Sequence, residues 1–251
     1  MILQALFGAT IIGLSLGVFG SGGSILTVPI LMYLLDVPAP LAIASSLAIV
    51  AGISFGGSIF NVLKRQVSYK HLILFGLPGM FGTYFGAWFG SVMGSKIQLF
   101  VFVVLMSIAA VFMWRGRKES APTNAQPLHL LLLEGFVVGV VTGFVGVGGG
   151  FLIVPALMFF AGLPMLLATG TSLMIIALNA SSGFMKYYEL YSSQAMTFDW
   201  PLIGIMVFGG ILGSLFGRSL STLLPKQSLQ KGFAVFLLAM SSFVFVRSVY
   251  L

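Results

Sequence analysis

The sequence predicts an all-α polytopic membrane protein built from two homologous repeats. Of the 251 residues, 59% are hydrophobic and only 7% are charged, whereas a soluble domain carries about 25% charged residues. Apolar segments of membrane-spanning length recur along the chain. The two halves also share one pattern of glycines. A surface with so few charges must face lipid rather than water.

Ten apolar segments follow one another along the chain. A membrane-spanning helix needs about 20 mostly apolar residues. Two segments contain only about 12, which would reach about 18 Å as a helix, and each of these two follows a glycine cluster. The segments fall near residues 2–20, 24–35, 40–62, 71–92, 97–114, 129–147, 150–161, 164–186, 200–220 and 229–250.

A polar stretch separates the two halves. The residues from Arg115 to Pro127 read RGRKESAPTNAQP, with no apolar periodicity, which is typical of a linker. We therefore expect a first transmembrane repeat over 1–114, a polar linker over 115–128 and a second repeat over 129–251. No basic residue precedes the first apolar run, so we expect that segment to be retained rather than cleaved as a signal peptide.

A glycine motif of the first half recurs in the second. The pattern G-x-x-x-G-x-x-G-x-G-G-x-x-x-x-V-P-x-L-M begins at Gly13 and again at Gly139, an offset of 126 residues. The repeat is a unit of about 125 residues, and such duplication is a hallmark of secondary transporters. The match continues through Pro38/Pro164, Ala42/Ala168, Ser46/Ser172 and Leu47/Leu173 and, after one inserted residue, Gly82/Gly209, Gly86/Gly213 and Gly90/Gly217.

This twice-repeated motif resembles the sulfite exporter TauE/SafE family of membrane anion transporters, and the resemblance covers essentially the whole chain. It implies a multi-pass protein of the inner (cytoplasmic) membrane. It also implies a secondary transporter for a small anion, such as sulfite, another sulfur-containing oxyanion or an organosulfonate. Substrates vary within the family, so the resemblance leaves the anion open. An anion channel and a non-transport membrane scaffold are the alternative functions.

The basic residues bear on the orientation of the repeats. If each glycine cluster is the tip of a hairpin, the repeats are inverted, and nine Lys and Arg residues share one side of the membrane against three on the other. If each glycine-interrupted segment crosses once, the repeats are parallel and the split is eight to four. The positive-inside rule favours the inverted arrangement, in which each repeat has a Gly-tipped broken or re-entrant hairpin and about three further transmembrane helices. Parallel repeats are the alternative.

The glycine clusters are the first candidate for a binding site. Glycine permits sharp reversals and close approach of the backbone to a ligand. The helix after each cluster starts with about four unpaired N–H groups, which an anion can satisfy with help from the helix dipole. Close helix packing is the alternative role, and it is the expected one for Gly13, Gly17, Gly82, Gly86, Gly90, Gly209, Gly213 and Gly217. The residues expected to bind the anion are Gly20, Gly22, Gly23, Ser24, Gly146, Gly148, Gly149 and Gly150.

Polar residues of the next helix in each half are the second candidate. Ser46, Thr171 and Ser172 belong to hydroxyl pairs at the starts of these helices, and hydroxyls can donate to sulfite-like oxygens. Ser172, Asn179 and Lys186 fall on one helical face, where polar side chains line a path or join helices. We expect Ser46, Thr171, Ser172 and Asn179 to belong to the substrate site. Lys186 would add a full charge if it turned inward.

Composition excludes several other functions. The chain has no cysteine, which rules out disulfides and thiol catalysis. Its two histidines, His71 and His129, each begin an apolar run and cannot build a metal site. We therefore expect no enzyme, no cofactor and no metal. The net charge is +7, and basic residues lie between the apolar runs. This placement indicates membrane topology rather than nucleic-acid binding. The expected partners are a small anionic substrate and the lipid bilayer, and a homo-oligomer is compatible with the sequence.

Overall fold

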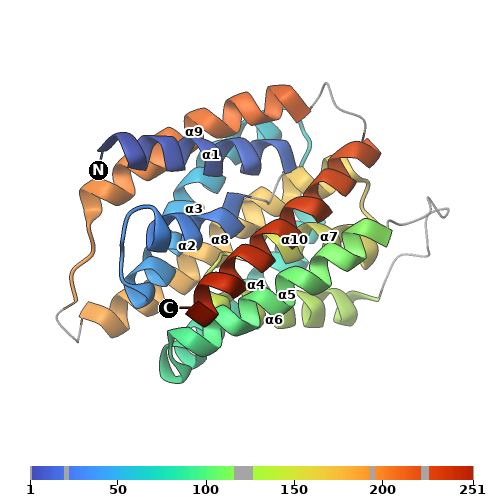
Figure 1. Cartoon of the computed structure of the whole chain (residues 1–251). Coiled ribbons are helices and arrows are strands. Elements are labelled where there is room, and N and C mark those ends of the chain that lie inside the picture. Colours follow the sequence, from blue (N-terminus) through green and yellow to red (C-terminus); the bar gives the residue numbers. More distant parts are fainter. Residues whose placement is uncertain (1, 20–22, 116–126, 193–195, 222–225, 251) are drawn as a thin grey trace.

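The computed structural model describes residues 2–19, 23–115, 127–192, 196–221 and 226–250, and over these ranges it is all-helical (Figure 1). Seven of the helices described are long and apolar enough to cross a membrane. The prediction of a polytopic helical membrane protein is thus confirmed. The helices are α1 (Ile2–Phe19), α2 (Gly23–Tyr33), α3 (Ala39–Leu63), α4 (Tyr69–Met93), α5 (Ser95–Arg115), α6 (Leu128–Val145), α7 (Gly150–Phe159), α8 (Met165–Ser192), α9 (Trp200–Ser221) and α10 (Lys226–Tyr250).

Helices α2 and α7 are the two short ones that the sequence predicts. They contain 11 and 10 residues, which corresponds to about 15–17 Å of helix. Each carries an internal proline, Pro29 in α2 and Pro155 in α7. Proline removes one backbone donor and bends a helix, so both short helices lack one backbone donor at equivalent positions.

The first helix of each half packs against the fourth helix of the other half. Helix α1 lies along α9, and α4 lies along α6 (Figure 1). Both interfaces are made by glycines, and a side chain at these positions would come within 3 Å of an atom of another helix. The predicted packing role is therefore confirmed for Gly13, Gly17, Gly82, Gly86, Gly90, Gly209, Gly213 and Gly217.

Helices α3 and α8 form the centre of the molecule and occupy equivalent places in the two halves. Gly183, late in α8, packs against Leu47, early in α3. Gly170, early in α8, packs against Asn61, late in α3. The two helices are therefore antiparallel. Around them, the outward faces are apolar, as lipid contact requires, and they expose Phe81, Phe85, Phe112, Phe208 and Phe216.

Candidate functional site

The second glycine cluster forms a tight buried turn between α6 and α7. Gly146, Gly148 and Gly149 all have positive φ angles, of 74°, 68° and 74°, a conformation that glycine adopts without the strain of a side chain. Gly146 is the C-cap residue that follows α6, and Gly149 is the N-cap residue that precedes α7. The sequence Gly-Val-Gly-Gly-Gly therefore specifies a sharp reversal, and Gly150 is the first residue of the helix that follows.

This glycine turn lies against the central pair of helices. The hydroxyl of Ser46, on α3, donates to the carbonyl oxygen of Gly146. A side chain at Gly148 would come within 2.9 Å of Val50 on α3 and 3.3 Å of Ala180 on α8. The structure thus brings Ser46 and the glycine turn together next to Ala180, the residue that follows Asn179.

The side chain of Asn179 is buried and makes no hydrogen bond to the described residues. Its exposed fraction is 0%, and neither its Oδ1 nor its Nδ2 atom has a partner among the described residues. A Cβ atom at Gly79 would lie 2.7 Å from the amide nitrogen, so α4 closes over this side chain. Ser54, on α3, is equally buried, and its hydroxyl also lacks a partner among the described residues. An unsatisfied buried polar group costs about 1–3 kcal/mol, and a bound polar ligand would remove that cost.

The remaining predicted site residues lie elsewhere. Gly20 and Gly22 fall outside the described residues. Gly23 begins α2 and faces the carbonyl oxygen of Ile12, which accounts for this glycine by packing. Ser24, the next residue, is fully buried.

Thr171 and Ser172 lie near the connection between α3 and α4. The Thr171 hydroxyl accepts a hydrogen bond from the backbone N–H of Ser68 at 2.9 Å. The Ser172 hydroxyl donates to the carbonyl oxygen of Thr169 at 2.8 Å. Thr171 therefore anchors the connection, and Ser172 bonds within its own helix.

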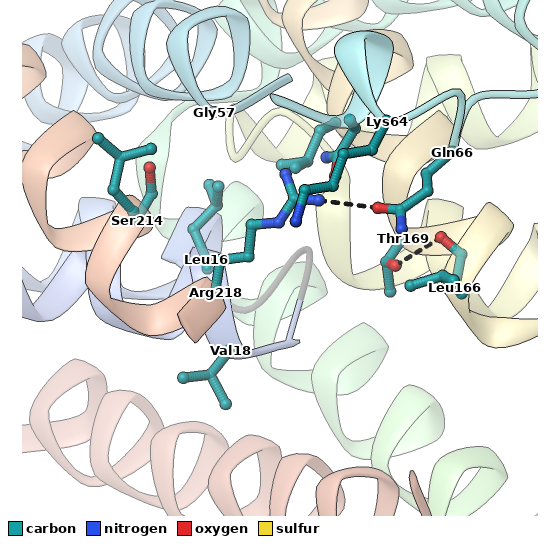
Figure 2. Close-up of a pocket in the computed structure, with 13 residues that line it drawn as sticks. Leu16, Val18, Gly57, Lys64, Gln66, Leu166, Thr169, Ser214 and Arg218 are labelled. Atoms are coloured by element: carbon teal, nitrogen blue, oxygen red, sulfur yellow. Dashed lines mark hydrogen bonds between the residues drawn. The ribbon is translucent and has the colours of Figure 1, made fainter. Parts of the chain in front are cut away.

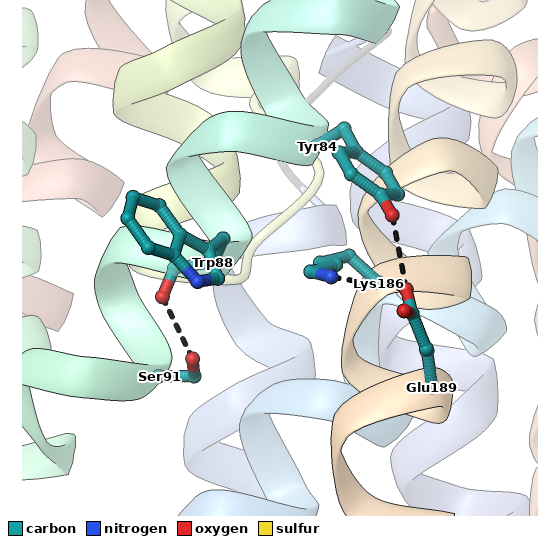
Figure 3. Close-up of polar contacts among 5 residues, drawn as sticks. All are labelled: Tyr84, Trp88, Ser91, Lys186 and Glu189. Atoms are coloured by element: carbon teal, nitrogen blue, oxygen red, sulfur yellow. Dashed lines mark hydrogen bonds and ion pairs between the residues drawn. The ribbon is translucent and has the colours of Figure 1, made fainter.

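Lys186 does not turn inward. Its Nζ atom lies 3.0 Å from Glu189 Oε2 and 5.0 Å from the centre of the Tyr84 ring. Tyr84 also donates to the same carboxylate at 2.9 Å (Figure 3). The positive charge is thus balanced locally, because Lys186 and Glu189 form a pair on one helix.

A cavity of about 120 Å³ lies near the opposite end of α8 (Figure 2). A single water needs only about 10–15 Å³ of such volume, so a small ion can enter. We call it the Arg218 pocket. None of the described residues that line it is acidic, and its lining consists of Leu16, Gly17, Val18, Gly57, Asn61, Lys64, Gln66, Leu166, Thr169, Leu173, Ser214, Leu215 and Arg218.

Arg218 dominates the electrostatics of this pocket. Its Nη2 atom donates to Gln66 Oε1 at 2.8 Å, and its guanidinium lies 5.8 Å from the centre of the Phe60 ring. Both contacts help to hold the guanidinium in place. Lys64 adds a second positive charge, and the side chains of Asn61 and Thr169 add hydrogen-bonding groups.

Sequence reasoning missed the Arg218 pocket because it assigned Arg218 and Lys64 to membrane topology. One signal was present. The glycines at 82, 86 and 90 match those at 209, 213 and 217, yet the next position is Ser91 in one half and Arg218 in the other. The repeat therefore carries a charge at this position in only one of its two copies, and membrane topology alone does not require that difference.

Comparison with known proteins identifies the family. The model of the family "Sulfite exporter TauE/SafE" matches residues 5–244. This chain belongs to the TauE/SafE family. A "Probable membrane transporter protein" of Xylella fastidiosa is 31% identical over 247 residues, which cover 95% of this chain and 92% of the relative. No solved structure gives a significant match.

More distant relatives carry a similar description. The "Probable membrane transporter protein YunE" of Bacillus subtilis is 26% identical over 248 residues, covering 84% of this chain and 88% of the relative. A third, from Methanocaldococcus jannaschii, is 26% identical over 188 residues, covering 70% of this chain and 68% of the relative. The TauE/SafE chain is therefore a multi-pass membrane transporter and not an enzyme.

In this TauE/SafE chain, the pocket and the buried amide share one helix. Leu173 lines the Arg218 pocket. Asn179 follows it by six residues, which is about 9 Å along the helix axis. The glycine turn contacts the next residue, Ala180. Polar groups thus extend from the pocket toward the middle of α8.

Proposed function

We propose that this protein is a secondary transporter that moves a small anion across the cytoplasmic membrane. Sulfite, another sulfur-containing oxyanion or an organosulfonate is the proposed substrate class. The observation that carries the proposal is the Arg218 pocket, which has two cations and no acidic residue among the described residues that line it.

The chemistry of the pocket suits an oxyanion. A guanidinium offers a planar set of donors that matches the oxygens of a sulfonate or sulfite group, and charge-assisted bonds of this kind are about twice as strong as neutral ones. Arg218 and Lys64 would repel a cationic solute. A neutral sugar carries no charge to pair with either cation, so the pocket favours anions.

The proposed transport route continues to the middle of the membrane. Asn179 and Ser54 offer buried hydrogen-bonding groups without partners among the described residues, and the glycine turn at 146–149 reaches the same region of α8. An anion that leaves the pocket would meet these groups and the start of α7. This is the support for Gly146, Gly148, Gly149, Gly150, Ser46 and Asn179 as substrate-site residues.

We further propose that the repeats 1–114 and 129–251 are inverted. The equivalent helices α3 and α8 pack antiparallel, as they must if one repeat is upside down relative to the other. Parallel repeats would orient them alike. The Arg218 pocket then lies on the side that carries the majority of the Lys and Arg residues, which the positive-inside rule makes cytoplasmic.

Ligand-dependent stabilisation of the purified protein tests the substrate class. Sulfite, thiosulfate and short sulfonates should raise the unfolding temperature, whereas amines and sugars should not. A ligand at 100 times its Kd stabilises by about 2.7 kcal/mol. Arg218→Gln should remove the effect. Arg115→Gln should keep it, because Arg115 ends α5 and is not among the lining residues of the pocket.

Flux in proteoliposomes separates the mechanisms. A transporter should show saturation and exchange of labelled for unlabelled anion, whereas a channel should not exchange in this way. A scaffold should show neither flux nor ligand-dependent stabilisation. Stabilisation by a cationic amine but by none of the anions would refute the substrate class.

A further inference from the structure

The two halves place equivalent residues at opposite ends of the molecule. The Arg218 pocket uses the ends of α1 and α3 and the start of α8. The offset of 126 residues relates Asn61 to Tyr187 and Val18 to Phe144. On α8, Tyr187 follows Leu173 by fourteen residues, or about 21 Å of helix. The counterpart of the pocket therefore lies at the far end of α8.

That counterpart is filled. Tyr187 has an exposed fraction of 0%, and Gln98, from α5, has one of 3%. The Gln98 amide nitrogen lies 2.7 Å from the Tyr187 hydroxyl and 2.7 Å from the carbonyl oxygen of Phe144, and it donates to both. A side chain at Gly90 would come within 3.0 Å of the Tyr187 hydroxyl. We call Gln98, Phe144 and Tyr187 the tyrosine plug.

The ends of the molecule also differ in charge. Beside the plug, Lys186 is paired with Glu189 (Figure 3). The pocket has Arg218 and Lys64 in its lining, and none of its described lining residues is acidic (Figure 2). The position equivalent to Arg218 is Ser91, whose hydroxyl bonds within its own helix to the carbonyl oxygen of Trp88 at 2.7 Å. One end of the duplicated fold is thus open and attractive to anions, and the other is closed.

We infer that the tyrosine plug is the closed gate of this transporter and that the Arg218 pocket is the open counterpart of the same structure. The inference rests on the proposed transport function. In inverted-repeat transporters, alternating access is largely a rocking or gating of one repeat against the other around a fixed site. Here that movement opens the plug when Gln98 releases Tyr187, and it closes the pocket around Asn61.

Accessibility of two matched cysteines tests the gate. The chain has no native cysteine, so Leu173→Cys and Leu47→Cys can each be labelled alone with a small, membrane-impermeant thiol reagent. Leu173 lines the pocket with an exposed fraction of 6%, whereas its equivalent Leu47 has an exposed fraction of 0%. In the purified protein, Leu173→Cys should react at least about tenfold faster than Leu47→Cys.

Variants that place a residue of one half at the equivalent position of the other half should change which end of the molecule is accessible. Tyr187→Asn with Gln98→Ala gives the plugged end a residue found at the open end, and Leu47→Cys should then react about as fast as Leu173→Cys. Conversely, Asn61→Tyr should protect Leu173→Cys. Tyr188→Asn is the control, because Tyr188 is 46% exposed on the same helix and lies outside the plug, and it should change neither rate.

The labelling is done without substrate, so its result does not depend on which solute is transported. Equal reactivity of Leu47→Cys and Leu173→Cys in the parent would overturn the gate. So would unchanged Leu47→Cys labelling in a Tyr187→Asn/Gln98→Ala variant that still elutes as a single folded species. If the gate behaves as expected but no anion stabilises the protein, only the proposed substrate class fails.

Discussion

The hydroxyl of Ser46 lies between two carbonyl oxygens, those of Ile43 on its own helix and Gly146 in the other half. This single side chain joins α3 of the first repeat to the glycine turn of the second. Both residues are buried, so no water replaces the bond. The turn is therefore held by the opposite half of the molecule.

Ser46→Ala should destabilise the protein. The substitution removes the donor that satisfies the buried Gly146 carbonyl, and an unsatisfied buried group costs about 1–3 kcal/mol. Ser107→Ala is the matched control, because the Ser107 hydroxyl donates within its own helix, to the carbonyl oxygen of Val103, at 2.9 Å. Thermal unfolding in detergent should separate the two variants, and equal unfolding temperatures would show that the bond is unimportant.

Two glycines of α9 should respond oppositely to alanine. A methyl group at Gly217 would collide with the Leu14 carbonyl of α1, whereas Gly204 has nothing within 4 Å. Overpacking costs about 1–3 kcal/mol, and alanine in an open helical position gains up to about 1 kcal/mol over glycine. Gly217→Ala should lower the unfolding temperature and Gly204→Ala should hold or raise it. A stable Gly217→Ala variant would contradict the close packing of α1 and α9.

Asn179→Leu should stabilise the protein and impair anion transport. Leucine has nearly the shape of asparagine, but it leaves no polar group unsatisfied beside Gly79, so the unliganded protein should unfold at a higher temperature. Stabilisation by anions and anion flux should both fall. Ser181→Ala, which removes a hydroxyl bonded to Ala177 within α8, should leave both unchanged. Normal flux through Asn179→Leu would exclude the amide from the transport route.

The orientation of the repeats predicts a labelling pattern. Single cysteines at positions 120 and 222 should both react from the cytoplasmic side, and Ser95→Cys should react from the other, because nine of the twelve Lys and Arg residues then face the cytoplasm. Spheroplasts and inverted vesicles give the two accessible sides. Labelling of 120 and 222 from opposite sides would favour parallel repeats.

The helices could be predicted from the sequence because apolar length and glycine spacing are local signals. The short α2 and α7 follow from the glycine clusters and from Pro29 and Pro155. The pairing of α1 with α9 could not be predicted in this way, because small residues at Gly13 and Gly213 show that a close contact exists and not which helix supplies it. The Arg218 pocket could not be predicted for the same reason, because its lining residues come from four different helices.

The two halves interlock, and this has a consequence for biosynthesis. Helix α1 enters the membrane first, but α9, which covers its glycine face, is among the last segments to be translated. Until then, the bare backbone along Gly13 and Gly17 borders lipid or an assembly factor. Neither half can complete its packing alone. Two fragments divided between α5 and α6 should therefore be degraded when expressed singly and should persist when expressed together.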